Sequence, residues 1–309
     1  MSNILFTPVP RILKDLLAEI KTGRLGLPEL QRGYVWKAAK VRELLDSMMK
    51  GYPIGYLMIW ESSDAGAKPP IGTDRKVYDT PKSLIIDGQQ RMCSLYSVMY
   101  GAEITNEKYQ TKPVIISFNP LTRTFAVADN ATKRAADWIY DISEAFAHVD
   151  RSFTYIPGKI AEISAARERA GNSLSDDEVN VIGQNIQDLL ALSNYNIPTL
   201  EINRNTDEES VADIFVRVNS GGKPLGENDF ILTLISLYWQ EGRNRIEDFC
   251  RRAKVPAPGT EYNFLFEPSP KHIVRVAMCF GFERAHTSYC AGMRLVNFQS
   301  SGASRILRS

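Results

Sequence analysis

Apolar positions in the first 130 residues switch between helical and strand spacing. Apolar side chains three or four positions apart predict helices over residues 11–21, 37–50 and 89–99. Runs rich in β-branched and aromatic residues predict strands over 56–60, 84–86, 113–118 and 124–128, and a weaker run favours one over 75–78. A rigid turn with two glycines and a proline, residues 51–55, precedes the first of these strands. We therefore predict mixed α and β structure around a small sheet.

The remainder of the chain has a mainly helical pattern. Helical spacing covers residues 141–148, 154–170, 175–192, 207–218, 227–239 and 243–254, and residues 197–202 have the pattern of a strand. Ser175 and Glu178 form a capping-box pattern at the start of one helix. The predicted fold class is α+β, a small mixed sheet with flanking helices followed by a mainly helical half. We place the division at residues 1–135 and 136–309.

Composition and charge narrow the classes of function. The 309 residues include 37 Lys and Arg against 36 Asp and Glu, so there is no overall basic field of the kind that attracts nucleic acid. The 4 cysteines are scattered without a Cys-x-x-Cys pair, which argues against a zinc site or a disulfide framework. No leader pattern is present and no apolar run approaches the length of about 18 residues that spans a membrane. We expect a soluble cytoplasmic protein with reduced thiols and no membrane partner.

Residues 83–99 combine a strand, a tight turn and a helix. Asp87 and Gly88 form the turn, and the helical spacing begins at Gln89. Unpaired N–H groups at the helix start, the positive end of the helix dipole and the charge of Arg91 together favour binding of an anion, most often a phosphate. A simple Asp-Gly turn with a solvated arginine is the competing explanation, and these residues alone leave it open.

A second loop, residues 27–36, pairs polar and aromatic side chains. Gln31 and Arg32 stand beside Tyr34 and Trp36, a combination suited to a charged planar ligand such as a nucleotide. In the alternative explanation, the two aromatic side chains are anchors in the core and Arg32 is a surface charge.

A third loop follows a predicted helix at residues 217–223. Arg217 and Lys223 flank two glycines, and the backbone N–H groups of such a nest can hold a phosphate or a carboxylate. The loop lacks the Walker pattern. A plain connection between two helices is the alternative.

These three segments together resemble one known family in their order and spacing. They are Leu-Pro-Glu-Leu-Gln-Arg-Gly-Tyr-Val-Trp at 27–36, Ile-Asp-Gly-Gln-Gln-Arg at 86–91 and Phe-Val-Arg-Val-Asn-Ser-Gly-Gly-Lys-Pro-Leu at 215–225. The chain is similar to the N-terminal domain of GmrSD-type modification-dependent restriction endonucleases, which carry an Asp-Gly-Gln-Gln-Arg motif. The resemblance implies a ParB/sulfiredoxin-like fold, binding of a nucleoside triphosphate that some members hydrolyse, and a part in bacterial defence against phage or modified DNA.

The resemblance also implies a role for each matching residue. Asp87 would bind Mg²⁺ or orient water, Gly88 would let the backbone approach the phosphates, and Arg91 would neutralise them. The implied catalytic residues are Asp87, Gln90 and Arg91. The implied nucleotide-binding residues are Gln31, Arg32, Gly88, Gln89, Arg91, Arg217, Asn219 and Lys223.

One departure from the family concerns the nuclease. Members that cut DNA carry a His-Asn-His-type metal site, whereas His148, His272 and His286 form no such constellation here. We therefore expect no nuclease activity in this chain and a nuclease domain or subunit as its partner. The last ten residues lack the pattern that ends a folded domain, and we expect a truncated or stand-alone version.

Two functions remain in competition. The first is a nucleotide-binding regulatory domain, with slow magnesium-dependent triphosphate hydrolysis as a further step. The alternative is a DNA-binding module without nucleotide hydrolysis, for which a basic helix would supply the contacts. The basic residues of that helix are Arg243, Arg245, Arg251, Arg252 and Lys254.

Overall fold

The structure of the chain is a computed structural model. It describes residues 5–27, 34–61, 83–106, 110–206, 240–254 and 266–282. It also describes Ser210, Val211, Ile214, Arg217, Val218, Leu232 and Ile235. The strand predicted at 75–78, and most of the helices predicted at 207–218 and 227–239, lie outside these residues.

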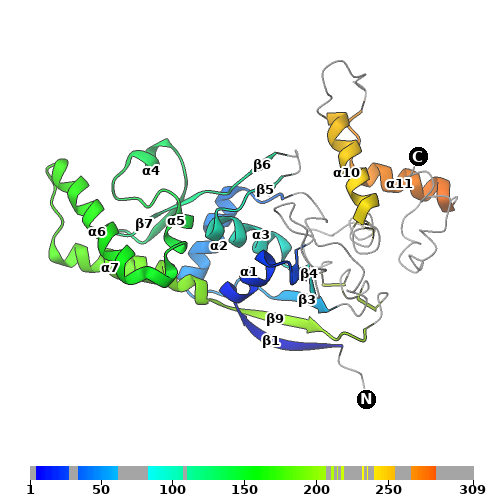
Figure 1. Cartoon of the computed structure of the whole chain (residues 1–309), viewed down its shortest axis with the longest axis horizontal. Coiled ribbons are helices and arrows are strands. Elements are labelled where there is room, and N and C mark those ends of the chain that lie inside the picture. Colours follow the sequence, from blue (N-terminus) through cyan, green and yellow to red (C-terminus); the bar gives the residue numbers. More distant parts are fainter. Residues whose placement is uncertain are drawn as a thin grey trace.

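A five-stranded mixed sheet organises the fold (Figure 1). Its strands are β1 (Phe6–Ile12), β2 (Leu25–Gly26), β3 (Leu57–Glu61), β4 (Ser83–Asp87) and β9 (Asn196–Ile202), in the order β1-β9-β3-β4-β2. Strand β9 runs antiparallel to β1 and parallel to β3, while β4 runs antiparallel to β3 and parallel to β2. The strands predicted at 56–60, 84–86 and 197–202 are confirmed, and they share this sheet.

Both faces of the sheet are covered, which explains the uninterrupted apolar runs of β3 and β4. Leu57, Ile59 and Ile85 join a core cluster with the apolar sides of α1 (Leu13–Lys21), α2 (Ala38–Met49) and α3 (Gln89–Tyr100). The intervening positions, Met58, Trp60, Leu84 and Ile86, form a second cluster with Ile202 and Val211. Successive strand residues point to opposite faces, so the alternation follows from the strand geometry.

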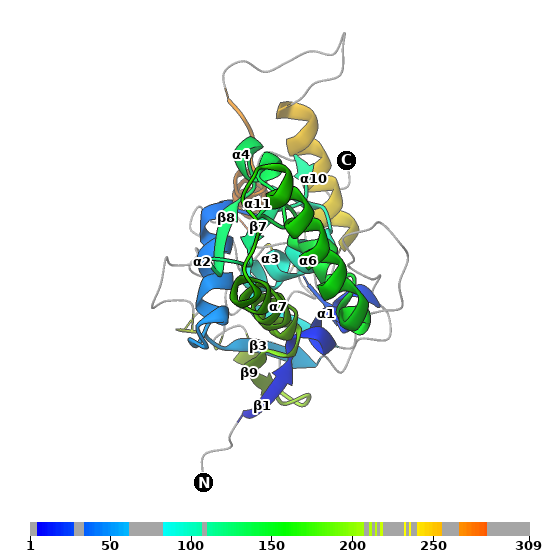
Figure 2. The ribbon, with the colours of Figure 1, turned by 90° about the vertical axis from the view of Figure 1, so that its left-hand side faces the viewer.

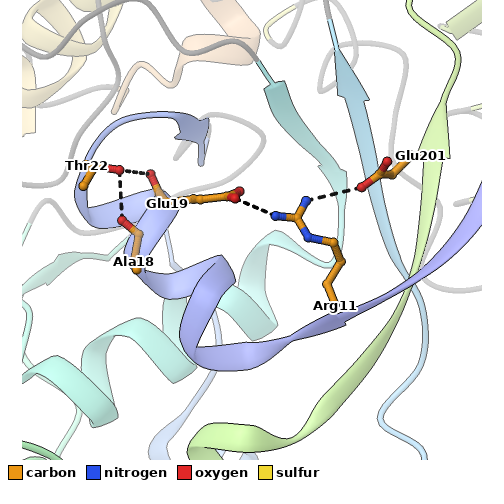
Figure 3. Close-up of polar contacts among 5 residues, drawn as sticks. All are labelled: Arg11, Ala18, Glu19, Thr22 and Glu201. Carbon is orange, nitrogen blue, oxygen red and sulfur yellow. Dashed lines mark hydrogen bonds and ion pairs between the residues drawn. The ribbon is translucent and has the colours of Figure 1, made fainter.

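The sequence pattern does not predict strand β1, and its prolines are the reason. Pro8 and Pro10 lack the N–H group that a central strand needs, but an edge strand tolerates them, and β1 is at the edge of the sheet. Arg11 joins this strand to its neighbours, because its guanidinium lies 2.7 Å from Glu19 of α1 and 3.3 Å from Glu201 of β9 (Figure 3).

The region after α3 begins with short strands. These are β5 (Ile104–Thr105), β6 (Thr111–Lys112), β7 (Ile116–Asn119) and β8 (Thr124–Val127). Strands β7 and β8 form the predicted antiparallel hairpin. The Asn119 side chain stabilises its turn, because Oδ1 accepts hydrogen bonds from the N–H groups of Leu121 and Thr122 at 2.9 and 3.0 Å.

Helices follow the hairpin, and the longer ones, α6 and α7, lie at one end of the molecule (Figure 1), the end that faces the viewer in Figure 2. They are α4 (Asn130–Arg134), α5 (Ile142–Phe146), η2 (Val149–Arg151), α6 (Ser152–Arg169), α7 (Asp176–Ala191) and η3 (Leu192–Asn194). The capping box predicted at the start of α7 is confirmed, since Ser175 and Glu178 bond each other's backbone N–H groups. Residues from both sides of position 135 enter the larger core cluster. The division of the chain at that position stays a prediction.

Two further helices close the described part of the chain, α10 (Gln240–Lys254) and α11 (Pro270–Phe282). They lie at the opposite end from α6 and α7 (Figure 1). In the portion of the chain that the structure describes, no helix has both the length and the apolar character needed to cross a membrane.

Candidate functional site at the start of helix α3

The predicted strand, turn and helix at residues 83–99 are present. Strand β4 ends at Asp87, Gly88 has a φ of 88°, and α3 begins at Gln89. That left-handed conformation is open to glycine without strain. Gly88 is also the N-cap residue, and it has no side chain that could accept hydrogen bonds from the first N–H groups of α3. No N-cap side chain therefore covers these donors or the positive end of the helix dipole.

The Arg91 guanidinium is directed at a neighbouring turn. One terminal nitrogen donates to the carbonyl of Ile54 and the other to the carbonyl of Tyr56. The second nitrogen also lies 3.7 Å from the Asp87 carboxylate, and the Arg91 side chain is 18% exposed. Burial lowers the pKa of Arg91, and the charge of Asp87 partly opposes that effect. Arg91 thus holds the backbone before β3, and its contact with a phosphate stays a prediction.

Two glycines make room for this guanidinium. A Cβ atom on Gly88 would lie 2.8 Å from Cδ1 of Leu57 and 2.9 Å from Nη2 of Arg91. A Cβ atom on Gly55, whose φ is 91°, would collide with Nη1 of Arg91. The group that approaches the Gly88 backbone closely is therefore Arg91 of the same chain. The sequence pattern did not predict that the backbone of residues 54–56 belongs to the site. The glycines and the proline of the turn at 51–55 were the pattern that could have indicated it.

The two glutamines of the motif have different partners. Gln89 is 8% exposed, and its amide donates to the carbonyl of Ile85 at 2.7 Å, within its own strand and turn. The Gln90 side chain accepts a hydrogen bond from the N–H group of Val35 at 3.0 Å. One turn further along α3, the Ser94 hydroxyl bonds that of Tyr34 at 2.9 Å. The structure thus brings the end of the 27–36 loop to the first turns of α3.

The aromatic side chains of that loop are anchors. Tyr34 is half-buried, and desolvation raises its pKa to about 12. Trp36 packs against the core, and Nζ of Lys40 lies 4.3 Å from the centre of its ring. Gln31 and Arg32, which precede these anchors, lie outside the described residues.

Two described residues that precede the third loop pack against the face of the sheet opposite α3. Val211 and Ile214 join the cluster of Met58 and Ile86, and Ile86 directly precedes Asp87 in β4. Arg217, about one helical turn after Ile214, is helical and exposed. That the Arg217 side chain lies close to Asp87 stays a prediction. Asn219 and Lys223 lie outside the described residues.

Comparison with known proteins places this arrangement in a family. Residues 13–236 match the family described as GmrSD restriction endonuclease, N-terminal domain. The chain belongs to this family. The matched region contains all three motif segments, and membership connects the chain to restriction systems. The family assignment thus agrees with the resemblance of the three segments, while the ParB/sulfiredoxin-like relationship of the fold stays a prediction.

An archaeal relative is much longer than this chain. The uncharacterized protein MJ0686 of Methanocaldococcus jannaschii is 25% identical over 244 residues. These cover 71% of this chain and 40% of the relative, so the chain spans less than half of that protein's length.

Asp87 is the carboxylate of the motif available to a metal ion. Among the residues that the structure describes, no three His, Cys, Asp or Glu side chains gather as a metal site. The Asp87 side chain is 34% exposed, and its closest described cation is 3.7 Å away. Mg²⁺ in nucleotide sites keeps several waters and takes one or two carboxylates plus substrate phosphates. A single partly exposed carboxylate therefore fits an Mg²⁺ ion that arrives with phosphates.

The basic stretch predicted to contact DNA lies on α10 and is partly neutralised. Arg243 is 3% exposed, and its Nη2 lies 2.5 Å from a Glu247 oxygen. The prediction that Arg243 is one of the surface charges that contact DNA is therefore wrong. Arg251 pairs with Asp248. Phosphate binding requires accessible cations, so these contacts do not favour the DNA-binding alternative.

Proposed function

We propose that this chain is the nucleotide-binding regulatory domain of a restriction system. It binds a nucleoside triphosphate together with Mg²⁺ at the N-terminal end of α3. The observation that carries the proposal is the meeting of two motifs at this helix start, where Gln90 bonds the backbone of Val35 and Ser94 bonds Tyr34. Residues 55 positions apart in sequence converge there, beside N–H groups that the N-cap glycine leaves uncapped.

Phosphate recognition in this proposal combines backbone and side-chain donors. The first N–H groups of α3 point along the helix axis toward the end of β4, and the helix dipole adds a partial positive charge there. In this proposal the remaining contacts come from the other two motif segments, through Gln31, Arg32, Arg217, Asn219 and Lys223. Gln89 and Arg91 act mainly through the backbone that they hold, since their amide and guanidinium donate to carbonyls of the chain.

Magnesium binds in this proposal only with the nucleotide. Asp87 would be the protein ligand of Mg²⁺, with phosphate oxygens and water as the others. The same carboxylate or the Gln90 side chain would orient a water molecule in a slow hydrolysis step. Asp87 is the one carboxylate in the motif, and it would serve both as the Mg²⁺ ligand and as the group that orients water. We therefore expect hydrolysis to be slower than binding and release of the nucleotide. A nuclease domain or subunit that acts on DNA is the proposed partner, in keeping with the family.

Calorimetric titration of the full chain with the four nucleoside triphosphates, with and without Mg²⁺, tests the proposal. In Asp87→Asn the magnesium-dependent affinity should fall about tenfold or more, because a charge-assisted contact contributes about 1.5–3 kcal/mol. Without Mg²⁺ the same variant should bind at least as well as the wild type, since a charge repelling the phosphates is gone.

Asp46→Asn is the matched control. Asp46 is a surface carboxylate on α2, 2.6 Å from Lys50, and its loss should leave binding unchanged. Failure of the folded wild-type chain to bind any of the four triphosphates would overturn the proposal. An equal dependence on Mg²⁺ in the wild type and Asp87→Asn would remove the metal role of Asp87.

A further inference from the structure

The turn held by Arg91 ends at an exposed tyrosine whose backbone adjoins the candidate site. Tyr56 is 60% exposed, although it directly precedes β3, whose first four residues are buried. Its backbone carbonyl and the Asp87 carboxylate are both neighbours of the same nitrogen of Arg91. In the sheet register Met58 pairs with Asp87, which places Tyr56 two residues before the partner of Asp87. Tyr56 therefore lies at the end of the sheet where α3 begins.

The backbone that carries this ring is fixed at both ends of the turn. Arg91 donates to the carbonyls of Ile54 and Tyr56. At the other end, the hydroxyl of Tyr195 donates to the carbonyl of Tyr52 at 2.7 Å. Because the backbone is already fixed, binding of a ligand to the ring would restrict only the side-chain torsions of Tyr56.

The two aromatic side chains of the 34–36 segment, which the structure describes beside the helix start, are already engaged. Tyr34 bonds Ser94, and Trp36 packs against the core with Lys40 over its ring. The sequence suggested these two rings as the ones that would face a planar ligand. Tyr56, by contrast, offers most of its surface to solvent.

We propose that Tyr56 is the residue that recognises the base of the bound nucleotide, by stacking its ring on the base. This inference rests on the proposed function, because it assigns the base of the same triphosphate. Arg91, Gly55 and Gly88 are positioning residues in this arrangement, since they set the backbone from which Tyr56 projects. Stacking on an aromatic ring tolerates different bases, so Tyr56 adds affinity for any nucleobase and discriminates against ligands without one.

Inorganic tripolyphosphate, which has the phosphates but no base, provides the decisive comparison. We expect the full wild-type chain to bind each triphosphate more tightly than tripolyphosphate in the presence of Mg²⁺. Tyr56→Ala should weaken nucleotide binding about tenfold and leave tripolyphosphate binding unchanged, because a base stacked on an aromatic ring loses about that much on truncation to alanine. Tyr56→Phe keeps the ring and should bind like the wild type.

Tyr100→Ala is the matched control, because Tyr100 is an exposed tyrosine at the opposite end of α3. It should bind both ligands like the wild type. Equal affinity of the wild type for nucleotide and tripolyphosphate, or an equal loss for both ligands in Tyr56→Ala, would refute base stacking and leave the proposed function standing. Absence of binding to both ligands by the wild type would overturn the proposed function and this inference together.

Discussion

Replacing Gly88 by alanine tests how the start of α3 is built. Gly88 has a φ of 88°, and an added Cβ atom would lie 2.8 Å from Leu57 and 2.9 Å from Arg91. Two independent penalties are therefore expected, one from the backbone conformation and one from the contacts. Gly51→Ala provides the control for the first, because Gly51 has a φ of 72° and nothing within 4 Å of its added Cβ.

The two penalties can be estimated separately. The left-handed conformation costs an alanine about 1–2 kcal/mol, and this applies to both variants. Overpacking in a closely packed site costs about 1–3 kcal/mol, and this applies to Gly88→Ala alone. We expect losses of about 2–5 kcal/mol for Gly88→Ala and about 1–2 kcal/mol for Gly51→Ala. Total stabilities are about 5–15 kcal/mol, so the first loss is a large part of the whole.

Urea denaturation followed by circular dichroism measures both losses. With an m-value of about 3 kcal/mol/M, a loss of 3 kcal/mol lowers the midpoint by about 1 M. The difference between the two variants isolates the contact of Gly88 with Leu57 and Arg91. If Gly88→Ala and Gly51→Ala lowered the midpoint equally, the close approach of the guanidinium to Gly88 would be refuted.

Two further predictions concern side chains of the site. Arg91→Lys replaces a forked donor by a single ammonium group, so one of the carbonyls of Ile54 and Tyr56 loses its partner. We expect a loss of about 1–3 kcal/mol in the same urea assay. Arg42→Lys is the control: the Arg42 side chain is 43% exposed, so stability should change by less than about 0.5 kcal/mol, and equal effects of the two variants would contradict the role of Arg91 in holding the turn. Burial raises the pKa of Tyr34 to about 12 from an unfolded value of about 10. The unfolded state therefore loses this proton at a lower pH than the folded state, so the contribution of Tyr34 to stability should be constant below pH 10 and should fall as the pH rises from about 10 to 12. Urea denaturation over this pH range should show a smaller fall in stability for Tyr34→Phe, and an identical fall would exclude Tyr34 as the source.

Much of the local structure could be predicted from residues that are neighbours in the sequence. The strand, turn and helix at 83–99 were predicted because the apolar run, the Asp-Gly turn and the helical spacing act over a few positions. The same holds for the Asn119 turn and for the Ser175 and Glu178 cap, whose bonds join residues no more than three positions apart.

The partners of the site residues could not be predicted in the same way. Arg91 reaches carbonyls 37 and 35 positions away, and Gln90 bonds a residue 55 positions away. A sequence shows that an arginine follows a turn, but its direction depends on which backbone the fold brings beside it. Neither explanation given for Arg91, a solvated side chain or a phosphate contact, included its hydrogen bonds to the turn before β3.

The sequence by itself determined the local elements, the position of the motif and, through three spaced segments, the family. Tertiary structure alone decided that β9 lies between β1 and β3, that β1 with its two prolines is an edge strand, and that Arg243 is buried. It also decided that Tyr34 and Trp36 are anchors while Tyr56 is exposed. The physical reason is range: turns, caps and helical spacing depend on adjacent residues, whereas strand order, burial and the partner of a long side chain depend on segments that meet only when the chain folds.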